Sequence, residues 1–114
     1  MQVTPFRPAV IDIGSNSVRM VVFDGADRCL APLYNEKAMS GLGLNLLATG
    51  RLNPEGRRSA ILTLQRFRRV ADDLGVSSLR AVATAAVRDA VDGSEFIRVA
   101  EDLLGYPIEV LSGE

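Results

Sequence analysis

The 114-residue sequence contains no histidine and no tryptophan, and it has a single cysteine, Cys29. The absence of histidine excludes imidazole as a general acid, a general base or a zinc ligand. One cysteine cannot form an internal disulfide or a pair of thiolate metal ligands, so we interpret Cys29 as a packing residue. Chemistry on this chain must therefore use carboxylates, arginines, hydroxyls, backbone amides or an oxygen-bound metal.

Strong charge of either sign and long apolar runs are also absent. Thirteen basic residues face fourteen acidic ones, for a formal net charge of −1. This balance favours neither nucleic acid nor a membrane surface as a partner. No apolar run approaches the ~20 residues of a membrane span, and the N-terminus lacks the apolar region of a signal peptide. We therefore expect a cytoplasmic protein with one hydrophobic core.

The first half of the sequence predicts an antiparallel meander. Apolar, β-favouring runs cover residues 9–13 and 18–23, and a weaker run covers 28–37. A turn at 24–27 separates the second run from the third. The proline-containing segment 1–8 is expected to be disordered or frayed.

In the second half, helices are expected to alternate with strands. Asn53-Pro54-Glu55 is typical of a helix start, and Gly75 is typical of its end. That helix has apolar residues every third or fourth position: Ile61, Leu64, Phe67, Ala71 and Leu74. Four further elements follow: a strand at 79–83, a short helix capped by Thr84, a helix capped by Ser94 with Phe96, Val99 and Leu103 on its buried face, and a strand at 108–111.

A strand–helix–strand order implies parallel pairing through crossover helices. Joined to the antiparallel meander, it predicts an α/β fold. The expected architecture is a mixed five-stranded sheet of order β-β-β-α-β-α-β with helices packed on it.

The turn between the first two strands carries the residues best suited to chemistry. Gly14 lets the backbone approach a ligand closely. Ser15, Asn16 and Ser17 add hydroxyl, carboxamide and N–H donors that suit phosphate oxygens. A buried carboxylate at a strand end, as expected for Asp12, needs a cation, a metal-bound water or hydrogen-bond donors. The alternative is an ordinary hairpin turn capped by Asp12.

The string Asp-Ile-Gly-Ser-Asn-Ser at 12–17 resembles the first phosphate loop of the exopolyphosphatase / guanosine pentaphosphate phosphohydrolase (pppGpp 5'-phosphohydrolase) family. That family belongs to the actin-like, sugar-kinase-like and Hsp70-like ATPase superfamily. Four further segments are similar to the family's in the same order: the glycine loop within 39–52, Ala-Thr-Ala-Ala-Val-Arg-Asp-Ala at 83–90, Asp92-Gly93 with Phe96, and Pro-Ile-Glu-Val-Leu-Ser-Gly-Glu at 107–114. The resemblance spans residues 9–114 and implies a ribonuclease H-like (actin-like ATPase) domain.

The resemblance also implies roles for individual residues. Residues 14–17 would contact the phosphates of polyphosphate or of a guanosine polyphosphate, and Arg88 would reach into the same cleft. A guanidinium suits this role because it pairs bidentately with phosphate oxygens and stays charged. The alternative for Arg88 is a surface arginine that caps a helix and pairs with neighbouring acids. Asp12 would lie at the base of the cleft, near a metal-bound water.

No catalytic residue is expected within the chain itself. In the family, the base is the second glutamate of Ser-Gly-x-Glu-Glu-Ala, and Ser112-Gly113-Glu114 matches only the first three positions. The catalytic glutamate would lie two residues past Glu114. The implied reaction, part of the stringent response, is hydrolysis of a terminal phosphoanhydride, usually with Mg²⁺. Residues 9–114 would form the N-terminal lobe, inactive without the missing C-terminal lobe.

Several alternatives stay open. The chain could be a phosphotransferase lobe of the acetate- or sugar-kinase type, or a non-catalytic polyphosphate- or nucleotide-binding domain. The Ser-Asn-Ser continuation and the segment at 83–88 favour the hydrolase. A homodimer is one alternative for the full-length protein. A cluster of basic residues is either a solvated helix face or a polyanion track: Arg51, Arg57, Arg58, Arg66, Arg68 and Arg69.

Overall fold

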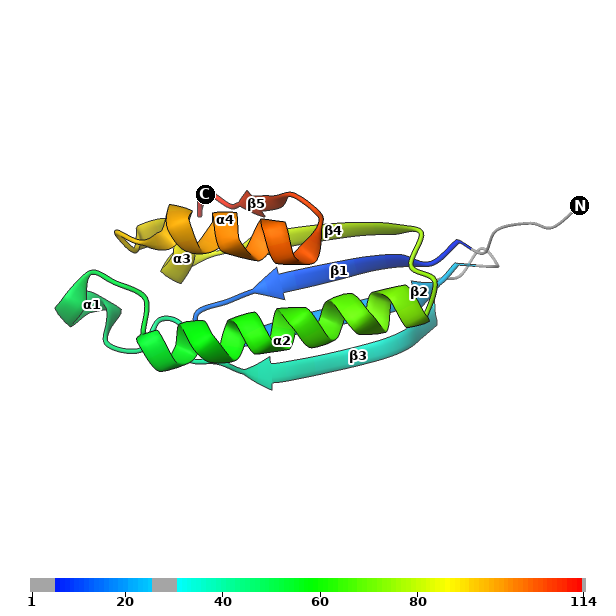
Figure 1. Ribbon diagram of the computed structural model, residues 1–114, viewed down its shortest axis with the longest axis horizontal. Coiled ribbons are helices and arrows are strands. Elements are labelled where there is room, and N and C mark those ends of the chain that lie inside the picture. Colours follow the sequence, from blue (N-terminus) through cyan, green and yellow to red (C-terminus); the bar gives the residue numbers. More distant parts are fainter. Residues whose placement is uncertain (1–5, 26–30, 114) are drawn as a thin grey trace, which may run out of the picture.

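The computed structural model describes residues 6–25 and 31–113 (Figure 1). Cys29, residues 26–27 of the expected turn, residues 1–5 of the expected frayed segment and Glu114 lie outside the described residues. The elements are β1 (Pro8–Ile13), β2 (Ser17–Asp24), β3 (Ala31–Met39), α1 (Leu46–Thr49), α2 (Pro54–Asp73), β4 (Ser78–Ala83), α3 (Ala85–Asp89), α4 (Gly93–Leu104) and β5 (Ile108–Val110).

The five strands form one mixed sheet in the order β3-β2-β1-β4-β5. β1 pairs antiparallel with β2, and β2 with β3. β4 pairs parallel with both β1 and β5. The predicted fold class is therefore confirmed. Because β1, β4 and β5 are parallel, their carboxyl ends lie at one end of the sheet, beside α1 and α3 at the left of Figure 1.

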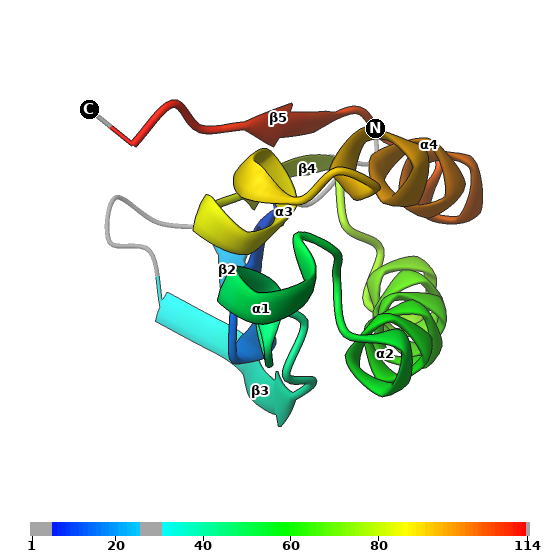
Figure 2. The ribbon, with the colours of Figure 1, turned by 90° about the vertical axis from the view of Figure 1, so that its left-hand side faces the viewer.

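One face of the sheet carries the core. Side chains alternate between the two faces of a strand, and Ile11, Ile13, Val18 and Met20 all lie fully buried on the same face. Figure 2 shows α2 and α4 side by side over that face. Asp12, which lies between Ile11 and Ile13 in β1, is exposed on the opposite face. The alternation thus decides which residues of the site end are available to solvent.

The long helix α2 begins and ends as its sequence predicts. The Asn53 side chain accepts a hydrogen bond from the Gly56 backbone N–H at 2.9 Å, which caps the helix. Leu64 and Phe67, on the side of α2 that faces the sheet, are fully buried. Gly75, in the left-handed conformation with φ 66°, follows its last turn. No helix within the described ranges is long and apolar enough to span a membrane.

The last helix, α4, begins earlier than expected. Its N-cap is Asp92, and Gly93 is its first residue, so the prediction that Ser94 caps it is wrong. A Cβ on Gly93 would lie 1.9 Å from the carbonyl oxygen of Val87. The helix therefore starts where its backbone touches α3, a contact that only glycine allows.

The buried face of α4 also differs from the predicted one. Phe96 is buried as expected, but Val99 is 41% exposed and Leu103 is only partly buried. Ile97 and Ala100 take the inner positions. The apolar stripe is wider than one periodic row, because α4 packs against α2 and α3 as well as β5. The prediction from a single row of apolar residues therefore gave the wrong buried face for α4.

The segment expected to be a loop, residues 41–50, contains the one-turn helix α1. Left-handed residues bound it on both sides, Asn45 with φ 63° and Gly50 with φ 72°. A single turn is too short to show helical periodicity in a sequence. All five strands also differ from their expected ranges by one or two residues at an end; the clearest cases are β1, which already begins at Pro8, and β3, which continues to Met39.

Candidate phosphate-binding site

The turn of residues 14–17 lies at the carboxyl end of β1. The Gly14 N–H donates to the Ser17 carbonyl at 2.9 Å and closes the turn. Asn16 is exposed, and Gly14, Ser15 and Ser17 are partly exposed. The four residues that sequence singles out therefore form one accessible turn.

The next loop, residues 40–43, holds the carbonyls of this turn. The Gly43 N–H donates to the Ser15 carbonyl at 2.9 Å. The N–H groups of Ser40 and Gly41 both donate to the Asn16 carbonyl, at 2.9 and 3.1 Å. The carbonyls of Ser15 and Asn16 thus face the same loop.

The orientation of the amides follows from these bonds. In a trans peptide unit, a carbonyl and the N–H of the next residue point in opposite directions. The described chain has no cis peptide bond. The N–H of Asn16 therefore points away from the 40–43 loop. The N–H of Ser17 points back toward Gly14, because an extended residue directs its N–H and its carbonyl to the same side and the Ser17 carbonyl accepts from Gly14. Successive free amides at the tip of a turn can form a concavity that binds anions.

The amides at the tip of the turn are free to bind a ligand. Within residues 6–25 and 31–113, no hydrogen-bond acceptor pairs with the backbone N–H of Ser15 or Asn16. Both residues are accessible to solvent. Water or an external acceptor must therefore satisfy these donors.

The 40–43 loop is itself fixed by the start of α2. Leu42 is fully buried, and its carbonyl accepts from the Asn53 N–H at 2.9 Å. A Cβ on Gly56 would lie 2.5 Å from the Gly41 carbonyl oxygen, so helix and loop are in direct backbone contact. The loop is thus held on one side by the helix and on the other by the turn.

A third segment, the start of α3, meets the other two. The Thr84 N–H donates to the Ile13 carbonyl at 3.1 Å. A Cβ on Gly43 would lie 3.0 Å from the Ser15 Cβ and 3.4 Å from the Ala86 Cβ. The turn, the 40–43 loop and α3 therefore converge at the carboxyl ends of β1 and β4, the edge where open α/β sheets bind ligands.

Arg88, in α3, lies at this same end of the sheet. Its Nε donates to Asp89 Oδ1 at 2.9 Å, and its Nη1 approaches the Leu111 carbonyl at 3.4 Å. The hydrogen bond with Asp89 raises the pKa of Arg88 further above its usual value, so the guanidinium is always charged. These contacts are those of an arginine paired with a neighbouring acid. Its contact with phosphate stays a prediction.

Arg88 also covers the end of β5. A Cβ on Gly113 would lie 2.4 Å from Arg88 Nη1, and Gly113 itself has φ 88°. The segment expected to lead into the family's catalytic turn is therefore in contact with the arginine. The expected position of the base, beyond Glu114, lies outside the described residues.

Asp12 differs from its prediction, because its carboxylate is exposed rather than buried. Its neighbours Ile11 and Ile13 occupy the core face, so alternation sends Asp12 to the face that the helices leave open, opposite Arg19 of β2. In the described ranges, no three acidic, cysteine or histidine side chains are grouped to hold a metal. One exposed carboxylate does not make a magnesium site by itself.

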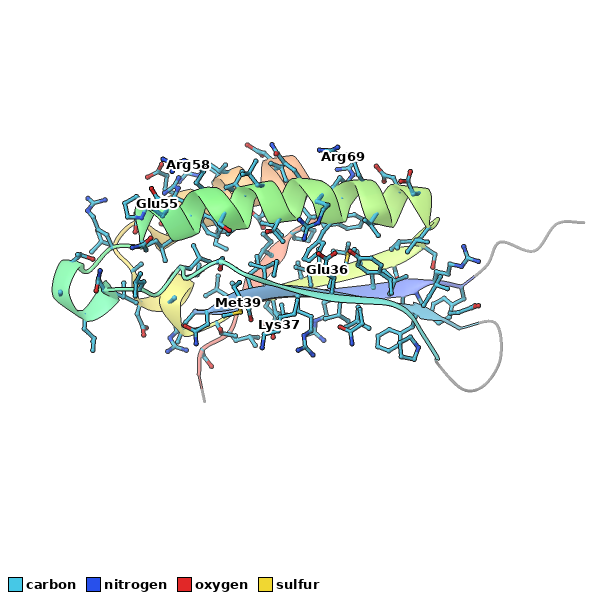
Figure 3. All side chains as sticks on the ribbon, turned by 90° about the horizontal axis from the view of Figure 1, so that it is seen from below. Glu36, Lys37, Met39, Glu55, Arg58 and Arg69 are labelled. Atoms are coloured by element: carbon cyan, nitrogen blue, oxygen red, sulfur yellow. The ribbon has the colours of Figure 1, made fainter. Side chains whose placement is uncertain are left out.

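The basic cluster is mostly neutralised within the domain. Four of its six arginines form ion pairs: Arg57 with Asp92 and Glu95, Arg58 with Glu55, Arg66 with Glu36, and Arg68 with Asp72. Figure 3 shows Arg58 and Arg69 on the side of α2 that is turned away from the sheet, whereas Glu36 of β3 points toward the helix. These pairs favour the solvated-face interpretation over a polyanion track.

Sequence reasoning missed the role of the 40–43 loop as the support of the turn. The signal was the pair of glycines Gly41 and Gly43, which we interpreted as part of a glycine loop similar to the family's, without a contact to the turn. Their backbone contacts with Asn16, Ser15 and Gly56 depend on the folded arrangement and leave no spacing pattern in the sequence.

Comparisons with known proteins identify the family to which this chain is similar. The sequence model described as the Ppx/GppA phosphatase family matches residues 21–114. A crystal structure of the Aquifex aeolicus member of the Ppx/GppA family superposes with a TM-score of 0.89 at 32% identity, over 94% of this chain and 35% of that one. An exopolyphosphatase from Cytophaga hutchinsonii ATCC 33406 gives 0.86 at 30% identity, over 92% and 34%.

A more distant likeness concerns the fold alone. Nucleoside triphosphate hydrolases from Neospora caninum match 95% of this chain and 28% of theirs, with a TM-score of 0.51 at 17% identity. These superpositions show that the chain shares its α/β fold with the Ppx/GppA structures and with these hydrolases. The chain spans about a third of the length of the relatives it matches.

Proposed function

The chain belongs to the Ppx/GppA phosphatase family, a family of hydrolases, and from this premise we propose that it is the phosphate-binding lobe of a phosphoanhydride hydrolase. The whole protein would cleave the terminal phosphoanhydride of polyphosphate or of pppGpp with water. This lobe binds the phosphate chain. The glutamate that acts as base in the family corresponds to a position two residues beyond Glu114, so we expect these 114 residues alone to bind phosphate without turnover.

One observation carries the proposal: the free amides of Ser15 and Asn16 at the tip of the 14–17 turn. Neither N–H has an acceptor within the described residues, and the Asn16 N–H points away from the 40–43 loop, because the Ser15 carbonyl is bound by that loop. Phosphate oxygens are strong acceptors, and hydrogen bonds to a charged acceptor are about twice as strong as neutral ones. The hydroxyls of Ser15 and Ser17 belong to the same turn and would add donors.

Arg88 supplies the positive charge of the site. A phosphate chain carries several negative charges, and backbone amides alone do not neutralise them. The guanidinium stays charged, and it is partly exposed at the same end of the sheet. Binding would let Arg88 exchange part of its contact with Asp89 for a bidentate contact with phosphate.

Mg²⁺ would neutralise phosphate charge in the whole protein. No three acidic side chains are grouped within the described residues, so we assign the further acidic ligands of Mg²⁺ to the part of the whole protein that this chain does not cover. Asp12 is the one carboxylate of the turn region, and its exposure suits contact with a metal-bound water. No step on this lobe depends on that contact.

The test is titration of the 114-residue chain with polyphosphate, pppGpp and ATP by calorimetry, with phosphate release in the presence of Mg²⁺ measured in parallel. We expect binding of polyphosphate or pppGpp without turnover. Arg88→Ala should weaken binding about tenfold, the size of a lost charge-assisted hydrogen bond.

Arg80→Ala is the matched control, because Arg80 is also exposed and pairs with one acid, Glu109, at 3.0 Å. It should bind like the unmodified chain. Binding of ATP alone would instead favour a kinase-like lobe. Silence with all three ligands would contradict the assignment, as would turnover unaffected by Arg88→Ala.

A further inference from the structure

We propose that Gly43 is a positioning residue of the 14–17 turn: its missing side chain sets the distance between Ser15 and α3, and so the direction of the Asn16 amide. This inference rests on the proposed function, because it concerns how the same phosphate site is held. Gly43 itself does not touch the ligand.

Space, rather than backbone conformation, requires glycine at position 43. The φ of Gly43 is not positive, so an L-residue could adopt its backbone. A Cβ there would nevertheless lie 3.0 Å from the Ser15 Cβ and 3.4 Å from the Ala86 Cβ. The first distance is well inside the ordinary carbon–carbon contact of ~3.5–4.0 Å.

At the other glycine of the loop, Gly41, the backbone conformation and not the available space requires glycine. Gly41 has φ 75°, and a Cβ on it would meet no atom within 4 Å. It is therefore needed for its conformation and not for space. Within four residues, the loop thus needs one glycine for its turn and a second one for its close contact with Ser15 and α3.

A methyl group at position 43 would move the turn rather than the loop. The loop is fixed from behind by the buried Leu42 and by the contact between Gly41 and Gly56. Ser15 is partly exposed at the tip of a turn and has room to shift. Its displacement would stretch the 2.9 Å hydrogen bond from the Gly43 N–H and rotate the peptide unit that carries the Asn16 N–H.

The experiment is a double-mutant cycle on the 114-residue chain. Its variants are Gly43→Ala, Ser15→Gly and the two combined, because Ser15→Gly removes the atom that the new methyl would meet. The readouts are the ¹H–¹⁵N signal of the Asn16 amide without ligand and the affinity for tripolyphosphate by calorimetry. Thermal melting confirms that each variant is folded.

The expected result is a displaced Asn16 signal and an affinity about tenfold lower in Gly43→Ala. In the double variant, both the Asn16 signal and the affinity should match those of Ser15→Gly alone. If Gly43→Ala does not fold, the double variant must fold, because the overlapping atom is gone. Additive effects, an unchanged Asn16 signal, or failure of both variants to fold would overturn the proposal.

Gly50→Ala is the matched control for loss of stability. Gly50 has φ 72°, so alanine is strained there, but its nearest neighbour would be Val91 at 3.9 Å, outside the site. It should melt earlier and keep both readouts. If the unmodified chain does not bind tripolyphosphate, the proposed function fails, and the Asn16 signal in the ligand-free cycle still decides the role of Gly43.

Discussion

The two ends of the sheet are held together in different ways. At the carboxyl end, loops contact each other through their main chains, and the carbonyls of Ser15 and Asn16 are the acceptors. At the opposite end, a side chain makes the main link: Arg7 Nη1 donates to the Leu74 carbonyl at the end of α2, at 2.7 Å. The Arg7 N–H also donates to Ser77 Oγ at 2.9 Å, and the Ser77 N–H donates back to the Arg7 carbonyl at 3.0 Å.

This difference shows where the protein keeps donors for a ligand. At the Arg7 end, the Arg7 N–H and Nη1 and the Ser77 N–H all donate inside the protein, and the Arg7 Nε, which has no partner in the described part of the chain, is buried away from any ligand. At the other end, the Ser15 and Asn16 carbonyls and the Gly14 N–H are used, while the exposed turn keeps the amides of Ser15 and Asn16 without a partner among the described residues. The end built from main-chain contacts is thus the end that can bind an anion.

The largest expected effect breaks the main-chain packing at the site end. Gly56→Ala would place a methyl group 2.5 Å from the Gly41 carbonyl oxygen. We expect a loss of about 3 kcal/mol in the free energy of unfolding, the upper range for overpacking. Urea denaturation measures it.

The matched change at the other end is Gly75→Ala. Gly75 has φ 66° and only one atom, Arg7 Nη1, at 4.0 Å from a new Cβ. Conformational strain alone should cost about 1 kcal/mol. Equal losses in the two variants would contradict the difference between the ends.

The second largest effect removes the side-chain link. Arg7→Met leaves the Leu74 carbonyl without its charged donor, and we expect a loss of about 2 kcal/mol. The affinity of the chain for tripolyphosphate should not change, because Arg7 lies at the end away from the turn. A lowered affinity in the folded variant would show that the two ends are coupled.

A smaller effect concerns the acid that competes for Arg88. In Asp89→Asn the carboxylate that accepts from Arg88 Nε at 2.9 Å is gone. The guanidinium is then free for phosphate, and tripolyphosphate should bind about threefold more tightly, the size of an exposed ion pair. Calorimetric titration measures this gain. Weaker binding would mean that Asp89 orients Arg88 for the ligand instead of competing with it.

The smallest effect lies between the two ends, where Tyr34 of β3 donates a hydrogen bond to Glu36. Burial, followed by this bond, raises the pKa of Tyr34 to about 12. The unfolded chain loses that proton near pH ~10. Stability is therefore complete below pH ~10 and decreases as the pH rises toward 12.

Since Tyr34 is near the surface, we expect this decrease to be less than about 0.5 kcal/mol. Urea denaturation between pH ~9 and ~12 measures it, and Tyr34→Phe should flatten the slope. A slope that persists in Tyr34→Phe would assign it to another group.

Local patterns predicted those parts of the fold that short stretches of sequence determine. Asn53 caps α2 as expected, and strands form at the expected apolar runs. The buried face of α4 could not be predicted, because it depends on how the helix is placed by the contact between Gly93 and the carbonyl of Val87, which belongs to α3.

The same distinction applies to the candidate site. The position of the turn at 14–17 could be predicted because small turn-forming residues stand between two apolar runs, whereas its contact with phosphate stays a prediction. The support of the turn by Ser40, Gly41 and Gly43 could not be predicted, since it consists of backbone hydrogen bonds that any sequence can make. Asp12 was misplaced because its expected burial came from its place at a strand end and not from the alternation that exposes it.

The most direct test of the central claim is a tripolyphosphate titration of the ¹⁵N-labelled chain, followed by its backbone amide signals. If the 14–17 turn is the phosphate site, the signals of Ser15, Asn16 and Ser17 should shift with one common affinity, whereas that of Ser77 at the far end should stay in place. Shifts confined to Ser77 and its neighbours, or no shift at Asn16, would contradict it.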